Sequence, residues 1–278
     1  MTHDILLCSD LDRTLLPNGP QPESSQARPL LRQLAARPEL TLAYVSGRHR
    51  ALLEQAIAEY DLPLPDYAIG DVGTTIYEIK AGGWRAWDDW YDEIAPDWRG
   101  KTREELQKLF AGIEVLRLQE PKKQNVLKLS YYAPADTGRD ELLTRLRRRL
   151  GSAGIRASLI WSIDEAADTG LLDILPQRAT KLNAIEFLMQ HKGFAHERTV
   201  FAGDSGNDLP ALTSGLQAVL VKNARDEVRD EALQRVQAGS YSDRLYLAQG
   251  GLFGMNGNYA AGVLEGLVHF LPQTRDWL

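Results

Sequence analysis

The chain has 278 residues, 44% hydrophobic and 25% charged, a balance typical of a globular protein that buries its core without disulfides. Its net charge of −6 argues against a general nucleic-acid binder, which needs a positive field. The single cysteine, Cys8, excludes an intrachain disulfide, and no apolar run approaches the length that spans a bilayer. Since the start also lacks a secretory signal pattern, we expect a cytoplasmic protein with no nucleic-acid or membrane partner.

From the N-terminus, short apolar runs alternate with segments of helical spacing. The first part predicts strands at 5–9 and 41–45 and helices at 27–36 and 51–60; the last part predicts a strand at 199–202 and helices at 181–191 and 209–215. Continuous apolar runs of this length are typical of buried strands in a parallel sheet. The alternation therefore predicts an α/β fold with a doubly wound parallel-sheet core.

The middle of the chain has a different composition. Residues 82–100 hold most of the tryptophan, and they are followed by a predicted helix (103–110), strand (126–133), basic helix (139–150) and strand (155–161). We interpret this part as a smaller α+β domain inserted at 83–173. The catalytic core then consists of 1–82 and 174–278.

The strongest chemical signal is Asp10-Leu11-Asp12-Arg13-Thr14, directly after the first predicted strand. In open parallel sheets, ligands bind at the carboxyl ends of the strands. Two carboxylates two positions apart on extended chain point the same way and repel each other, so they need a cation or a shared proton. Mg²⁺, which prefers oxygen ligands, would meet that need. Taken alone, the pentapeptide also fits a solvated turn.

A second cluster, Ser46-Gly47-Arg48, lies between a predicted strand and a helix. A hydroxyl and a free N–H group at a helix start form an anion site, and an arginine adds charge-assisted contacts. An N-cap serine followed by a turn glycine explains the same residues without a ligand.

Two more clusters come late in the chain. Lys181 opens a predicted helix, where the macrodipole disfavours a cation unless an anion lies nearby. Asp204, Asn207 and Asp208 lie on a glycine-containing loop after the strand at 199–202, a composition that turns also favour. The ordered occurrence of all four clusters is what favours a shared site.

This ordered set resembles the haloacid dehalogenase superfamily along the whole chain. The resemblance implies a phosphatase in which Asp10 is the nucleophile, Asp12 the general acid and then base, and Lys181 the neutralising cation. It implies Mg²⁺ as cofactor, bound by Asp10, the main-chain carbonyl of Asp12, Asp204 and Asp208. It implies that Ser46 and the Gly47 N–H hold the phosphate and that Asn207 orients water, phosphate or Lys181. Leu11 and Arg48 are further predicted substrate-binding residues.

Within the superfamily, the segments 42–48, 72–77, 124–131, 173–178, 223–224 and 262–270 look like those of the sucrose-phosphate phosphatase group. That likeness implies sucrose 6-phosphate as the substrate, a role in sucrose synthesis, a cap domain that sets specificity, and a sugar-phosphate synthase as a partner. Asn125 and Lys128 are the cap residues that we expect to bind sugar hydroxyls, although a solvated strand face also explains Lys128. The sequence predicts no oligomeric state.

Other readings stay open. Arg13 replaces the small or neutral residue usual in the group, which leaves the identity of the sugar open; mannosylfructose phosphate and other sugar phosphates are alternative substrates. A phosphomutase, or a sugar-phosphate sensor without turnover, is a further alternative.

Overall fold

The computed structural model describes residues 5–164 and 167–278, which form two compact units. The core unit contains the described residues up to Ala86 together with Lys181–Leu278, and the inserted unit is Trp87–Thr180. The predicted fold class, a parallel-sheet α/β core with a smaller α+β part, is confirmed.

An eight-stranded sheet forms the centre of the core unit, in the order β12-β11-β10-β1-β2-β3-β4-β5. The six strands from β12 to β3 run parallel, and β4 and β5 add an antiparallel hairpin at one edge. The strands are β1 (Ile5–Ser9), β2 (Leu40–Val45), β3 (Tyr67–Gly70), β4 (Thr75–Lys80), β5 (Gly83–Ala86), β10 (Thr199–Gly203), β11 (Gln217–Leu220) and β12 (Leu245–Leu247).

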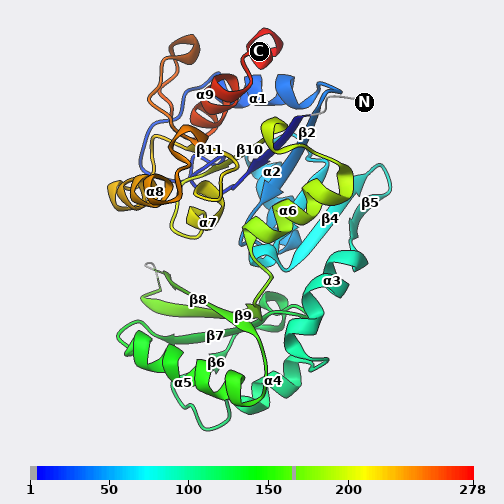
Figure 1. Ribbon diagram of the computed structural model, residues 1–278, viewed down its shortest axis with the longest axis vertical. Helices are drawn as coiled ribbons and strands as arrows, with labels where there is room; N and C mark the ends of the chain where they lie inside the picture. The colour runs from blue at the N-terminus through cyan, green and yellow to red at the C-terminus, as the bar shows by residue number, and fades with distance from the viewer. Residues whose placement is uncertain (1–4, 165–166) are drawn as a thin grey trace. The chain divides into compact units, whose positions relative to one another are not determined.

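The central strands are covered on both faces. All five residues of β1 are buried, and successive side chains of a strand point to opposite faces, so packing must be present on each side. Helix α1 packs against α9, and α6 packs against α7 (Figure 1). The helices are α1 (Ala27–Ala35), α2 (Arg50–Glu59), α6 (Lys181–Lys192), α7 (Leu209–Leu212), α8 (Asp226–Gly239) and α9 (Ala260–Phe270).

The inserted unit contains an antiparallel sheet in the order β6-β7-β9-β8. Its longest helix, α5, buries leucines spaced three and four positions apart, which is the pattern of a helix with one apolar face. The elements are α3 (Asp88–Ile94), α4 (Arg103–Leu109), β6 (Arg117–Leu118), β7 (Leu129–Pro134), α5 (Arg139–Ser152), β8 (Ala157–Asp164) and β9 (Thr169–Pro176).

The boundaries of the inserted unit differ from the expected 83–173. Residues Gly83–Ala86 form β5 of the core sheet, because they pair with β4. At the other end, β9 runs to Pro176 and pairs with β7 and β8, so 174–176 belong to the inserted sheet. The apolar run within β9 is typical of a core strand, which is why sequence alone ended the insert too early.

Two of the tryptophans from residues 82–100 are packing residues. Trp90 and Trp98 are 2% and 0% exposed inside the inserted unit, whereas Tyr91 is 42% exposed.

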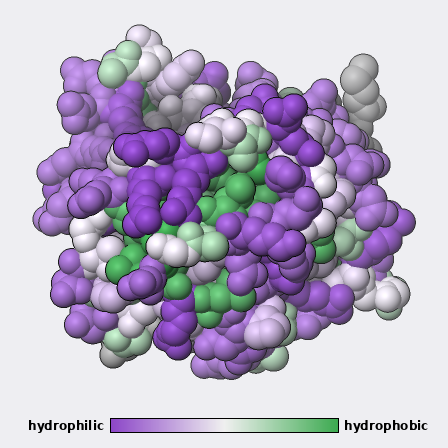
Figure 2. Space-filling view, turned by 90° about the horizontal axis from the view of Figure 1, so that it is seen from below, coloured by the Kyte–Doolittle hydropathy of each residue, from purple (hydrophilic) through white to green (hydrophobic). Residues whose placement is uncertain are grey.

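In the view from below, hydrophilic side chains cover most of the surface and enclose an apolar patch (Figure 2). Among the described residues, no helix has the length and apolar character needed to cross a membrane.

Candidate active site

The sheet topology brings the polar clusters of the core unit together. Strand β1 lies between β2 and β10 in parallel register, so the residues that follow these three strands meet at one edge. Asp10 follows β1, Ser46 follows β2, and Asp204 follows β10. The Asp10 N–H donates to the Ala202 carbonyl at 2.9 Å, which ties the first motif to β10.

Lys181, the first residue of α6, is the centre of a buried ion cluster. Its Nζ lies 3.0 Å from Asp10 Oδ1 and 2.8 Å from Asp208 Oδ1, and it donates to Asn207 Oδ1 at 3.3 Å. The side chains of Lys181, Asp10 and Asp208 are 4%, 6% and 0% exposed, so these charges interact with little screening by water. The macrodipole disfavours a lysine at a helix start unless an anion lies nearby, and here two carboxylates fill that role.

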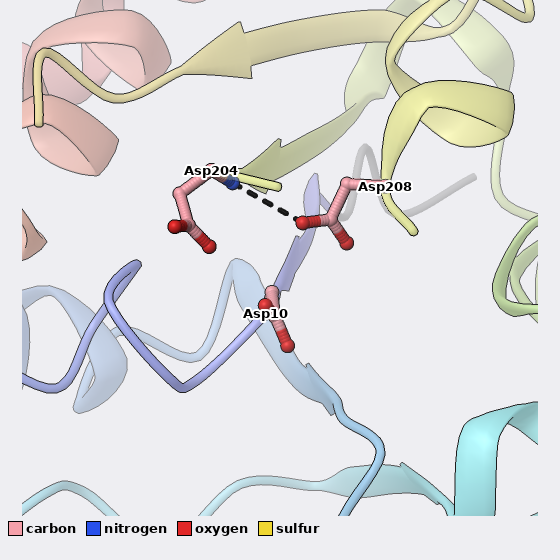
Figure 3. A group of neighbouring side chains, drawn as sticks. All are labelled: Asp10, Asp204 and Asp208. Atoms are coloured by element: carbon pink, nitrogen blue, oxygen red, sulfur yellow. Dashed lines mark hydrogen bonds between the residues drawn. The ribbon is translucent and has the colours of Figure 1, made fainter. Parts of the chain in front are cut away.

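Asp208 is fixed by the loop around it. Its Oδ2 accepts hydrogen bonds from the N–H groups of Asp204 and Ser205 at 3.2 and 3.1 Å, and Figure 3 shows the first of these. A Cβ at Gly203 would lie 2.7 Å from the Asp208 carboxyl carbon, so this close approach requires glycine. The glycine in the loop motif thus has a packing reason.

Asp204 has its own partners. Thr14 donates to Asp204 Oδ1 at 3.2 Å, and Arg13 Nε lies 3.4 Å from Oδ2. Burial, together with repulsion from Asp208, raises the pKa of Asp204 to about 6, although Arg13 opposes the shift. Arg13, whose side chain differs from the group pattern, thus contacts a carboxylate of the site.

The ion cluster around Lys181 contains more carboxylates than ammonium groups. Burial raises the pKa of Asp10 well above its ordinary value; Lys181 counteracts that shift, whereas Asp208 and Asp204 add to it. Burial alone would lower the pKa of Lys181, but its two carboxylate partners raise it above the ordinary value, so the ammonium stays charged. Crowded buried carboxylates with raised pKa values favour an added cation.

The donor set fits a hard divalent ion. Asp10, Asp204 and Asp208 each offer a carboxylate oxygen, and these atoms lie within 4.8 Å of one another (Figure 3). Mg²⁺ is usually held by one or two carboxylates and water. Because Asp208 already accepts from Lys181 and two backbone N–H groups, Asp10 and Asp204 have the most free acceptor capacity. The carboxylate of Asp12 is not part of this cluster.

The Asp12 carboxylate is held elsewhere. Arg48 donates to it through two nitrogens at 2.6 and 2.8 Å, and Asn18 donates to it at 2.8 Å. Burial raises the pKa of Asp12, but the hydrogen bonds and charge of Arg48 outweigh it, so the pKa lies below the ordinary value. Asn18 is a residue that sequence reasoning missed; its only signal is its place in a Pro-Asn-Gly turn.

Three further predicted substrate-binding residues have distinct environments. Ser46 is fully buried and its Oγ accepts from the Arg48 N–H at 3.2 Å, whereas Gly47 is exposed. Leu11 is also fully buried and packs in the hydrophobic core, so only its main chain is available to a ligand. Substrate binding by all three stays a prediction.

Asn125 and Lys128 belong to the inserted unit. Lys128 is 7% exposed and its Nζ lies 3.9 Å from Asp173 Oδ2, so it does not lie on a solvated strand face. Asn125 pairs with Lys128 in an isolated β-bridge and lines a cavity of about 560 Å³ formed by residues of the inserted unit. Both residues stay candidates for binding sugar hydroxyls.

The chain is similar to known proteins over most of its length. The sequence model of the family described as sucrose-6F-phosphate phosphohydrolase matches residues 3–271. A Nitrosococcus oceani protein described only as a HAD-like hydrolase is 62% identical, covering 100% of this chain and 75% of its own length. The mannosylfructose-phosphate phosphatase of Agrobacterium fabrum is 27% identical, covering 95% and 96%.

Solved structures include one that is similar in both sequence and fold. The sucrose-phosphatase of Synechocystis, determined in complex with sucrose and phosphate, is 30% identical with a TM-score of 0.73. The match covers 96% of this chain and 98% of that one.

Proposed function

The chain belongs to the sucrose-6F-phosphate phosphohydrolase family of the haloacid dehalogenase superfamily, and on this basis we propose that it hydrolyses sucrose 6-phosphate with the help of Mg²⁺. Membership makes it a phosphoric monoester hydrolase. The observation that carries the proposed chemistry is the buried Lys181 ammonium, which contacts both Asp10 and Asp208 beside Asp204. Cytoplasmic location and a synthase partner stay predictions.

In the proposed reaction, an Asp10 oxygen attacks phosphorus, the bond from phosphorus to the sugar oxygen breaks, and Asp12 protonates the leaving oxygen. Water then attacks the phosphoaspartate, Asp12 accepts its proton, and phosphate leaves. Lys181 balances the negative charge that gathers between Asp10 and the phosphoryl oxygens. Asp10, Asp204 and the Asp12 carbonyl would hold Mg²⁺, which would supply Lewis-acid neutralisation of the phosphate. Asp208 orients Lys181.

Asp12 has to be protonated to act as an acid, and its contact with Arg48 opposes this. We therefore propose that the substrate phosphate draws Arg48 away from Asp12. A phosphate dianion offers the same bidentate geometry with more charge, so it competes well for the guanidinium. Arg48 then binds phosphate, as its place beside Ser46 and Gly47 predicts, and Asp12 becomes free to carry a proton.

A second substrate has specific support. The Agrobacterium mannosylfructose-phosphate phosphatase matches nearly the whole chain at 27% identity, close to the 30% of the sucrose-phosphatase. Hydrolysis of mannosylfructose phosphate is therefore the alternative within the same chemistry.

Phosphate release from a panel of sugar phosphates tests the substrate. We expect kcat/KM to be highest for sucrose 6-phosphate, followed by mannosylfructose phosphate, with free hexose phosphates well behind. Equal values across the panel would contradict the sucrose assignment and leave a general sugar phosphatase. Transfer of phosphate within a sugar, without release, would instead indicate a phosphomutase, and binding without turnover a sensor.

Asp10→Asn tests the nucleophile. Because the amide oxygen cannot form the acyl phosphate, we expect turnover to fall by about 10⁴-fold or more and no acid-stable phosphoenzyme to be trapped. Asp243→Asn is the matched control, since the Asp243 side chain is 80% exposed and forms an ion pair with its neighbour Arg244. Turnover by Asp10→Asn near the control rate would exclude the phosphoaspartate route.

A further inference from the structure

Arg13 adopts a backbone conformation that is costly for its residue type. Its φ of 59° lies in the left-handed region, where a residue with a Cβ loses about 1–2 kcal/mol relative to the right-handed form. Strain of this kind persists only where surrounding contacts impose it, and such sites often have a functional reason. We therefore expect specific contacts to hold the Arg13 backbone in this conformation, and the conformation to have a function.

Two amide side chains hold the backbone of Arg13. Asn18 Oδ1 accepts from the Arg13 N–H at 2.8 Å, and Asn223 Nδ2 donates to the Arg13 carbonyl at 2.6 Å. Asn223 is 3% exposed and is itself fixed, because its Oδ1 accepts from the Tyr259 N–H at 2.7 Å. The turn is thus clamped from both sides by residues far apart in sequence.

The clamp directs the guanidinium to Asp204. Arg13 Nε lies 3.4 Å from Asp204 Oδ2, and a terminal nitrogen of Arg13 donates to the Asn223 carbonyl at 3.5 Å. The Arg13 side chain is 30% exposed, whereas that of Asp204 is 6% exposed. The cation therefore approaches the carboxylate from its solvent side.

The two cations, Lys181 and Arg13, pair with different carboxylates of the cluster. Lys181 pairs with Asp10 and Asp208, and Arg13 pairs with Asp204. Asp204 is also one of the three carboxylates whose oxygens converge within 4.8 Å. A divalent ion bound by this cluster would therefore share Asp204 with Arg13.

We propose that Arg13 is a built-in counter-cation of the metal site, which shares Asp204 with Mg²⁺ and weakens the binding of that ion. This inference rests on the proposed Mg²⁺ dependence. Without metal, Arg13 offsets the charge of Asp204. With metal, two positive groups lie on one carboxylate and repel each other, so affinity is lower than the carboxylates alone would give.

Isothermal titration of the whole chain with MgCl₂, without substrate, tests the proposal. Arg13→Gln removes the charge and keeps a side chain of similar length, and Arg13→Gly removes both charge and strain. For both we expect the Mg²⁺ dissociation constant to fall by about fivefold, the size of effect that one partly exposed charge has. Arg13→Lys, which keeps the charge, should stay within about twofold of the unmodified chain.

Arg32→Gln is the matched control. It removes one positive charge from the core unit, where Arg32 pairs with Asp61 at 2.8 Å away from the acidic cluster. Its Mg²⁺ affinity should be unchanged. Circular dichroism of each variant checks that it folds, and the unfolding midpoint should rise more on adding Mg²⁺ in Arg13→Gln than in the unmodified chain.

The outcomes separate two failures. If the unmodified chain binds Mg²⁺ and Arg13→Gln binds it equally or more weakly, the counter-cation role is wrong while the proposed function stands. Tighter binding in Arg13→Gly alone would assign the effect to backbone strain and also overturn the role. If the unmodified chain binds no Mg²⁺, the proposed metal dependence fails, and this inference fails with it.

Discussion

Asp12 is held by three nitrogen donors, from Arg48 and Asn18, and its pKa lies below the ordinary value. An acid in this position matters most when the leaving group is a poor one, because a sugar alkoxide needs a proton to depart whereas p-nitrophenolate does not. A comparison of substrates with poor and good leaving groups therefore distinguishes acid catalysis by Asp12 from a structural contribution of this residue.

We expect Asp12→Ala to lower kcat/KM for the sugar phosphate by about 10²–10⁴-fold, the usual contribution of a general acid. For p-nitrophenyl phosphate the loss in kcat/KM should be at most about tenfold, since this parameter covers the steps up to leaving-group departure. Steady-state rates on both substrates measure the difference. An equal loss on both would assign Asp12 a role in the shape of the site rather than in proton transfer.

Which residues of the site can be predicted from the sequence depends on the kind of contact that each residue makes. Asp10, Asp204 and Lys181 were identifiable because they follow strands or open a helix, and adjacent parallel strands necessarily bring their carboxyl ends together. The contacts of Arg13 and Asn18 were not, because they depend on the conformation of one turn. A left-handed φ at arginine has no signal in the sequence.

At the level of elements, the return from the inserted unit to α6 is anchored by one buried carboxylate. Asp97 is fully buried; its Oδ2 accepts from the Arg178 N–H at 2.8 Å and its Oδ1 from Arg178 Nε at 3.2 Å, and Arg156 also donates to Oδ1. Arg178 lies three residues before Lys181. The contact fixes the segment between β9 and α6.

We expect Asp97→Ala to destabilise the inserted unit by about 2–3 kcal/mol, because a backbone N–H and one nitrogen of each guanidinium lose their acceptor, a loss moderated by the partial exposure of both arginines. Urea unfolding followed by tryptophan fluorescence measures it, since Trp90 and Trp98 are buried in this unit. Glu93→Gln is the control: it removes only the outer partner of Arg178 and should cost under about 1 kcal/mol. A cost of Asp97→Ala as small as that of the control would contradict the anchoring role.

The elements also show where periodicity is ambiguous. The helices at 27–35 and 181–192 begin where the sequence predicted and end within one residue of it, because helical spacing in them is regular. Strand β9 was assigned to the core sheet in part, because an apolar run has the same appearance in either sheet. Only pairing with β7 and β8 decides its place, and pairing is a property of the tertiary structure.

For the molecule as a whole, the acidic cluster links stability to pH and to metal. The pKa of Asp204 is raised to about 6 from an ordinary value near 4, and that of Asp10 is raised in the same direction. In this range the folded chain binds more protons than the unfolded chain, so its free energy of unfolding falls as pH rises. Carboxylates with lowered pKa values, such as Glu78 at about 2, have the opposite effect, but that effect is complete below pH 5.

The metal-free chain should therefore lose about 1 kcal/mol of stability between pH 5 and 8 from Asp204 alone, with a further loss from Asp10. Saturating Mg²⁺ should remove this loss, because the ion binds the deprotonated carboxylates and so replaces the protons. Urea unfolding at pH 5, 6, 7 and 8, in a chelator and in excess MgCl₂, measures both curves. Asp204→Asn isolates the contribution of that residue: without metal its curve should be flatter than that of the unmodified chain by about 1 kcal/mol. A metal-free stability that stays level or rises from pH 5 to 8 would mean that the carboxylates are already neutralised without an ion, and the reason for a metal at this site would be lost.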